Sequence, residues 1–264
     1  MYQSEKWIAH FTANLKEQRI NWHQNPCITN EEKSKLIPSL KAWQLGETSD
    51  GSNLLCAATK YARSANEPGY VDAIALFIKE EQKHGENLGR YLDAIGEKRI
   101  RKNWGDSLFR YVRHINTSME IWTLAVITVE SAAQVYYQAL KDATRCTLLK
   151  AICTDILTDE AYHISFQVER MKTMYEPKTP LKKQLLNGFY LFFYICTALI
   201  IWAAHKKVFI AGNNTFRSYA RKMKYKYLRT LKRLSAEDRE PRLVREDMML
   251  FTLAQTLSKP YKQN

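Results

Sequence analysis

Residues that interrupt helices are scarce in this sequence. Among 264 residues there are 9 glycines and 7 prolines, while 45% of the residues are hydrophobic. This composition predicts long helices with few turns and enough apolar surface for a complete core. The length suits one large domain, or one domain with an appendage.

Several familiar functional signals are missing as well. The sequence has no phosphate-binding loop, no serine nucleophile elbow and no zinc spacing of Cys and His. Its five cysteines form no Cys-x-x-Cys pair, and residues 1–11 hold no apolar signal core. We therefore expect reduced thiols and a cytoplasmic protein.

Acidic residues are outnumbered, because 27 Asp and Glu stand against 40 Lys and Arg, which gives a formal net charge of +13. This excess favours anionic partners, which include acidic proteins, anionic lipid surfaces and nucleic acid. Nucleic acid is the weakest of these, since no groove-reading or base-stacking motif is present. We expect no nucleic-acid binding.

Two copies of the pattern Glu-x-x-His carry most of the chemical information. One copy contains Glu81 and His84, and the other contains Glu160 and His163. On a helix, positions three apart lie on one face, so each pair can offer a carboxylate and an imidazole to one point. One such pair is common by chance, but a second copy makes a metal site a strong interpretation.

Two further acids complete a larger pattern. Glu47 lies 34 residues before Glu81, and Glu130 lies 30 residues before Glu160. These intervals suit a pair of antiparallel helices with a short connection. Four carboxylates and two imidazoles are ligands that suit two iron ions, or one manganese and one iron.

This arrangement resembles the dinuclear carboxylate site of the ferritin-like superfamily, in which two helices each give a Glu and two others each give a Glu-x-x-His. The resemblance implies an all-α fold: a ferritin-like four-helix bundle with a di-metal centre, to which this chain adds an N-terminal helix and extra C-terminal helices. It also implies that Glu47 and His84 bind one metal ion. Glu130 and His163 would bind the other, and the two motif acids, Glu81 and Glu160, would bridge the pair.

The acid before each motif has an expected role too. A metal-bound His usually donates its second N–H to a carboxylate, a carbonyl or water. We expect Asp159 to orient His84 and Glu80 to orient His163.

The nearest named resemblance is to the soluble acyl carrier protein desaturases, over roughly residues 31–175. The stretch from Glu80 to Leu88 is similar to their first motif, and Ile152–Cys153 with 159–163 is similar to their second motif and its approach. Ala133 stands where those desaturases carry Thr. Rubrerythrins, di-iron N-oxygenases and ribonucleotide reductase small subunits have similar ligand sets.

Apolar periodicity predicts the helices of the bundle and divides the chain into a bundle region, 1–180, and a C-terminal extension, 181–264. The long helix that carries Glu47 has two interpretations, because Gly46 and Gly51 weaken it: it runs through the site, or it breaks there. The expected helices span 1–25, 31–65, 70–95, 108–115, 118–142 and 145–174.

The extension begins with an apolar helix, 185–204, inside an uncharged stretch with basic residues at both ends. Three interpretations stay open: a helix packed on the bundle or at a homodimer interface, a helix dipped into one leaflet, and a membrane span. A basic amphipathic helix, 216–234, follows. It could lie on anionic lipid, grip an acidic carrier protein, or cover the core as a solvated surface helix. Another helix is expected at 243–257.

The predicted function is O2-dependent oxidation of an organic, acyl or lipid-like, substrate by a di-iron or Mn/Fe enzyme, with an electron donor protein as a further partner. One alternative is an iron-binding or peroxide-scavenging protein, although the Cys₄ site of rubrerythrin-type proteins is missing. The other is a membrane-associated helical scaffold. Tyr137 and Tyr162 could be redox-active near the metals, but packing is the favoured interpretation for both.

Overall fold

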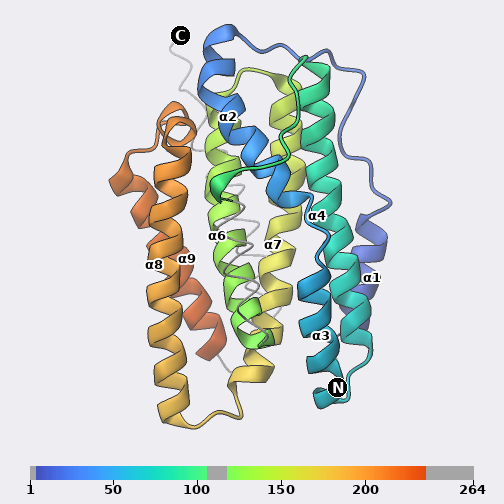
Figure 1. Ribbon diagram of the computed structural model, residues 1–264, viewed down its shortest axis with the longest axis vertical. Helices are drawn as coiled ribbons and strands as arrows, with labels where there is room; N and C mark the ends of the chain where they lie inside the picture. Colours follow the sequence, from blue (N-terminus) through green and yellow to red (C-terminus); the bar gives the residue numbers. More distant parts are fainter. Residues whose placement is uncertain (1–3, 106–117, 236–264) are drawn as a thin grey trace, which may run out of the picture.

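A computed structural model describes residues 4–105 and 118–235, and every regular element in these residues is a helix (Figure 1). The all-α fold class is thus confirmed. The helices expected at 108–115 and 243–257 lie outside the described residues. The helices are α1 Ser4–Asn14, α2 Asn30–Glu47, α3 Ser52–Ala65, α4 Gly69–Ala94, α6 Met119–Ala143, α7 Thr147–Tyr175, α8 Pro180–Ala211 and α9 Phe216–Ser235.

The bundle has four columns: α2 continued by α3, then α4, α6 and α7. The α6–α7 pair packs along its length, α4 packs on α2, α3 and α7, and α1 covers α4. Apolar side chains at helical spacing fill the interior, among them Leu40, Ile74, Ile127 and Ile152, all fully buried. Burying these side chains is the main source of stability, at roughly 1.5–3 kcal/mol for each large one.

The helix expected at 31–65 is two helices, so the break at the site is the correct interpretation. Residue Glu47 ends α2, and Gly51 adopts a left-handed φ of 67° before α3 begins. A side chain at Gly51 would place its Cβ 2.6 Å from Cδ1 of Ile78. Pro38 lies inside α2 without ending it. The poor helix formers after Glu47 therefore make a tight connection beside α4.

The helix expected at 1–25 is also shorter, because α1 ends at Asn14, well before Pro26. The side chains of Asn14 and Arg19 turn inward to bind carboxylates of the bundle. A capping box begins α2: Thr29 Oγ1 accepts from the Glu32 amide, and the Glu32 side chain accepts from the Thr29 amide.

The first extension helix is longer than the expected 185–204, since α8 starts at Pro180, where Thr179 caps it, and reaches Ala211. It packs on α6, α2 and α9, so the bundle-packed interpretation describes one of its faces. By length and composition alone it could cross a membrane. The basic helix α9 lies where it was expected and packs on α6, α7 and α8.

Candidate metal centre

The structure brings all six predicted ligand residues together at one depth of the bundle. Two groups of ligand atoms form, and within each group the atoms lie within 4.8 Å of one another. Glu81 belongs to both groups, which is the position expected of a bridging carboxylate. The first group is Glu47, Glu81 and His84, and the second is Glu81, Glu130, Glu160 and His163.

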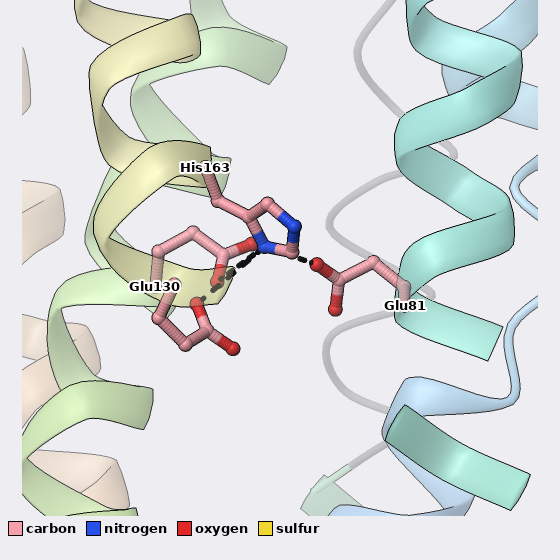
Figure 2. Close-up of side chains that lie close together, drawn as sticks. Glu81, Glu130 and His163 are labelled. Carbon is pink, nitrogen blue, oxygen red and sulfur yellow. Dashed lines mark ion pairs between the residues drawn. The ribbon is translucent and has the colours of Figure 1, made fainter. Parts of the chain in front are cut away.

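The second group is centred on the His163 imidazole of α7. Figure 2 shows Glu81 reaching from α4 toward this ring, while Glu130 approaches from α6. Nδ1 of His163 lies 2.7 Å from Oε1 of Glu81, 3.9 Å from Oε2 of Glu130 and 3.7 Å from Oε2 of Glu160. The other Glu160 oxygen, Oε1, lies 4.0 Å from Nδ1 of His84. Glu160 thus faces both imidazoles, one with each oxygen.

The far side of each imidazole meets a buried carboxylate. Nε2 of His84 lies 2.9 Å from Oδ2 of Asp159, and Nε2 of His163 lies 2.7 Å from Oε2 of Glu80. All four side chains are fully buried. A carboxylate bonded to Nε2 keeps the proton there and leaves Nδ1 as the free electron pair, which points into the cluster.

The N-terminal segment holds both of these outer carboxylates. The Asn14 side-chain amide donates to Glu80 and, at 2.8 Å, to Asp159. The Arg19 guanidinium donates to Asp159 and, at 2.5 Å, to Asp155. Sequence reasoning missed Asn14 and Arg19, because they lie outside the motif helices. The one available signal was the positive charge of Arg19, which lies in the helix expected at 1–25.

These hydrogen bonds set the charges of the outer carboxylates. Although burial alone would raise the pKa of Asp159, its hydrogen bonds to His84 and Arg19 hold that pKa far below the usual range. For Glu80, burial again opposes the hydrogen bonds, here those with His163 and Asn14, and the resulting pKa is lowered. Both residues are therefore ionised and accept hydrogen bonds as anions, which are the stronger kind.

Two of the inner carboxylates, Glu47 and Glu160, show the opposite behaviour. Burial first, and then the neighbouring Glu81, raise the pKa of Glu47 well above its usual value. Burial and the neighbouring Glu130 do the same for Glu160. Like charges this close disfavour joint ionisation, so a compensating positive charge is needed for all of them to be anionic at once.

The unsatisfied atoms of the cluster fit metal ions. Buried side-chain atoms without a hydrogen-bond partner include Nδ1 of His84, Nδ1 of His163, both oxygens of Glu160 and Oε1 of Glu81. Buried polar atoms are normally paired, so several orphans that face one point need a shared ligand. Oxygen and imidazole donors suit two iron ions, or iron with manganese.

The break after α2 positions Glu47. Gly85, next to His84 on α4, lets the end of α2 approach closely, because a Cβ there would lie 2.6 Å from Cγ2 of Thr48 and 3.1 Å from the Glu47 carbonyl carbon. Tyr137 of α6 then donates to Oε1 of Glu47 at 2.6 Å. Tyr137 is fully buried and touches the candidate centre, whereas the Tyr162 ring packs at a tilt against His10, with ring centroids 4.2 Å apart.

A cavity of about 260 Å³ opens beside the cluster. Glu47, Glu81 and Glu130 line it, and α2, α3, α4, α6 and α8 contribute to its walls. Most of the wall is apolar, with Trp43, Phe77, Ile78, Trp122, Val126, Val129 and Ile201 among its side chains.

His205 of α8 also lines this cavity. Its Nδ1 lies 2.5 Å from Oγ of Ser39, and its ring packs on Trp43 and Tyr136 at centroid distances of 5.7 and 5.5 Å. Burial lowers the pKa of His205 to about 4. The imidazole is therefore neutral at physiological pH.

Comparisons with known proteins agree with this architecture. No protein-family model matches the sequence, and no curated protein matches it. Solved structures do match. An R2-like ligand-binding oxidase with an aerobically reconstituted Mn/Fe cofactor has a TM-score of 0.65 and 18% identity, over 89% of this chain and 93% of that chain.

Two mutants of the R2-like ligand-binding oxidase match equally well. One has an anaerobically reconstituted Mn/Fe cofactor, a TM-score of 0.65 and 18% identity. The other has an Fe/Fe cofactor, a TM-score of 0.64 and 17% identity. Each match covers 89% of this chain and 94% of the other. The comparisons do not single out the acyl carrier protein desaturases. At these identities they show a shared architecture, so this chain has the ferritin-like fold of the R2-like oxidases.

Proposed function

We propose that this protein is a di-metal oxidase, with two iron ions or one manganese and one iron held by Glu47, Glu81, His84, Glu130, Glu160 and His163. One observation carries the proposal: two groups of buried ligand atoms share Glu81, and acids of both groups line an apolar cavity. The fold neighbours support it, since they are named as oxidases with Mn/Fe or Fe/Fe cofactors.

When bound, such a metal pair supplies O2 activation and the oxidising power that protein side chains lack. The chain provides everything else. Asp159 and Glu80 hold the two imidazoles in one tautomer. The hydroxyl oxygen of Tyr137 lies 2.6 Å from Oε1 of Glu47, so its proton can be given to or taken from that carboxylate.

The substrate we propose is an apolar organic molecule such as an acyl chain. Trp43, Phe77 and Trp122 line the cavity, and burial of apolar surface against them is favourable. These walls also exclude water from the reacting centre. A protein that only stores iron would have no use for such a chamber, so the cavity favours the oxidase over the iron-handling and scaffold alternatives.

Metal content tests the centre. After anaerobic loading with ferrous iron, or with iron and manganese, we expect about two metal ions per chain, as in related carboxylate bundles. The double variant Glu81→Ala, Glu160→Ala should lose them, and circular dichroism checks that it remains helical. Glu86→Ala is the matched control, because Glu86 lies on the same helix but is exposed and pairs with Arg99. A metal content unchanged by the double variant would refute the assignment.

A cavity variant tests the substrate class separately. Ala125→Phe would fill part of the chamber from α6 without replacing a ligand residue. We expect unchanged metal content and loss of the extra O2 consumption that fatty acids or acyl compounds stimulate. Stimulation of equal size in this variant would show that the cavity does not hold the substrate.

A further inference from the structure

The outer face of α8 is unusual for a soluble bundle. Exposed large apolar side chains recur along it at intervals of three, four and seven residues, which places them on one side of the helix. These side chains are Leu181, Leu185, Phe192, Ile195 and Leu199, each between 48% and 69% exposed. The row extends over about 27 Å at the rise of an α-helix.

The opposite face of α8 is already used. Tyr190, Tyr194, Ile201 and Val208 are buried, and Tyr194 donates to the Met223 carbonyl of α9 at 3.0 Å. The helix is thus apolar on both sides, and such helices are normally buried in a core or in a membrane. Figure 1 shows α8 at the outer edge of the bundle, on the side away from α1 and α4. Within the described part of the chain, no helix packs on its outer row.

The charges around this row identify what covers it. Lys182 and Lys183 lie at one end of α8, Lys206 and Lys207 lie at the other, and α8 contains no acid. The neighbouring α9 adds eight Lys and Arg and no acid. Lys206 and Lys207 form no ion pair with any described residue.

We propose that this face of α8 docks on an anionic lipid surface. A helix that lies in the plane of a membrane keeps both ends at the level of the headgroups, so basic residues at both ends match anionic headgroups while the row between them enters the acyl region. A second copy of the chain fits less well. In a parallel or an antiparallel α8 pair, basic ends would meet basic ends and repel each other.

Docking would also place the cavity beside the lipid. Ile200 and Ala204 are exposed at the border of the outer row, and both line the cavity. An apolar substrate could then pass from the lipid along α8 to the candidate centre. This passage rests on the proposed oxidase function, whereas the docking itself does not.

Sedimentation with vesicles tests the docking. The full chain is mixed with vesicles of phosphatidylcholine alone or with added phosphatidylglycerol, at low and high salt. We expect binding to the anionic vesicles that weakens with salt and little binding to neutral ones. Lys206→Glu with Lys207→Glu should weaken binding at least about tenfold. Phe192→Ser with Ile195→Ser should weaken it about tenfold through lost apolar insertion.

A charge-matched control separates the α8 surface from net charge. Lys16→Glu with Lys60→Glu changes the charge equally at exposed positions away from α8 and should leave binding nearly unchanged. Equal loss in this control, or no binding of the full chain to either vesicle, would overturn the docking. So would a stable dimer in sedimentation velocity that Phe192→Ser with Ile195→Ser dissociates. Vesicle binding is measured without added metal, so a failure to bind vesicles would not bear on the metal-content experiment.

Discussion

The segment from α8 to α9 and the rest of the chain differ in how they carry charge. Residues 180–235 hold 12 Lys and Arg and no Asp or Glu, whereas all other residues together hold 28 Lys and Arg and 27 Asp and Glu. Nearly the whole net charge of +13 therefore belongs to one helical pair. Buried charged groups with partners, such as Glu80, Asp159 and Arg170, lie mainly in the bundle, while on α8 and α9 most basic groups face solvent.

This difference separates two uses of charge. A buried charge is costly, so the bundle keeps it only where a partner or a ligand compensates for it, as at Asp159 and Glu160. An exposed, unpaired charge adds little to folding but acts on molecules outside. The buried charges of the bundle therefore serve its internal chemistry. The charges of α8 and α9 instead serve association with other molecules. Substitutions in the two regions should differ accordingly.

The largest effect is expected at a buried ion pair of the bundle. Arg170 donates to both oxygens of Glu67 and is almost fully buried with it. Glu67→Ala would leave the guanidinium buried and unpaired, which should lower the free energy of unfolding by about 3–5 kcal/mol. Urea denaturation measures it. A loss below 1 kcal/mol would mean that Arg170 finds water or another partner.

The next effect depends on pH and concerns His205, the histidine of α8. Because burial lowers its folded pKa to about 4, below the usual histidine value of 6.5, its stabilising contribution is complete above pH 6.5 and is lost as pH falls toward 4. Between pH 7 and 4 the free energy of unfolding should fall by roughly 2–3 kcal/mol from this group. His205→Gln should show a correspondingly smaller fall. Identical pH profiles of the two proteins would contradict the assignment.

A third effect concerns metal affinity. Asp159→Asn keeps the shape of the side chain but removes the anion that holds His84 and Arg19. Affinity for ferrous iron should fall by about 10- to 100-fold, as for other outer carboxylates of metal sites. Anaerobic titration measures it, and Asp155→Asn, which keeps Asp159, is the comparison variant. Equal losses of affinity in both variants would mean that the effect comes from the contacts with Arg19 rather than from the hydrogen bond to His84.

The smallest effect is expected for Lys206 and Lys207, the two basic residues near the end of α8. Lys206→Ala and Lys207→Ala remove exposed, unpaired charges, so each should change the free energy of unfolding by no more than about 0.5 kcal/mol. Thermal unfolding in the same buffer measures both. A loss of several kcal/mol would show that these residues stabilise the fold, and the contrast between the two regions would disappear.

The ligand set was predictable because its rules are local. Spacing of three on a helix puts Glu81 beside His84 and Glu160 beside His163 whatever the rest of the chain does. The intervals to Glu47 and Glu130 then follow from helix length. Even the partners of the imidazoles could be expected, since Asp159 and Glu80 sit next to motif acids.

Other features depend on contacts between distant segments, and the sequence left these open or gave no sign of them. The end of α2 at Glu47 is decided by close packing at Gly85 and Ile78, which belong to another helix. The hydrogen bonds of Asn14 and Arg19, and the inward position of His205, depend in the same way on which surfaces meet. Periodicity describes one helix at a time, so it does not report such pairings.

The hydrogen bond between Asn14 and Asp159 has a consequence for biosynthesis. Its two residues are 145 positions apart, so this bond can form only after nearly the last helix of the bundle has been made. Closing so long a loop is slow, and the ligand group of Glu81, Glu130, Glu160 and His163 is incomplete until α7 has been synthesised. The complete set of six ligand residues is therefore a late feature in the life of each new chain.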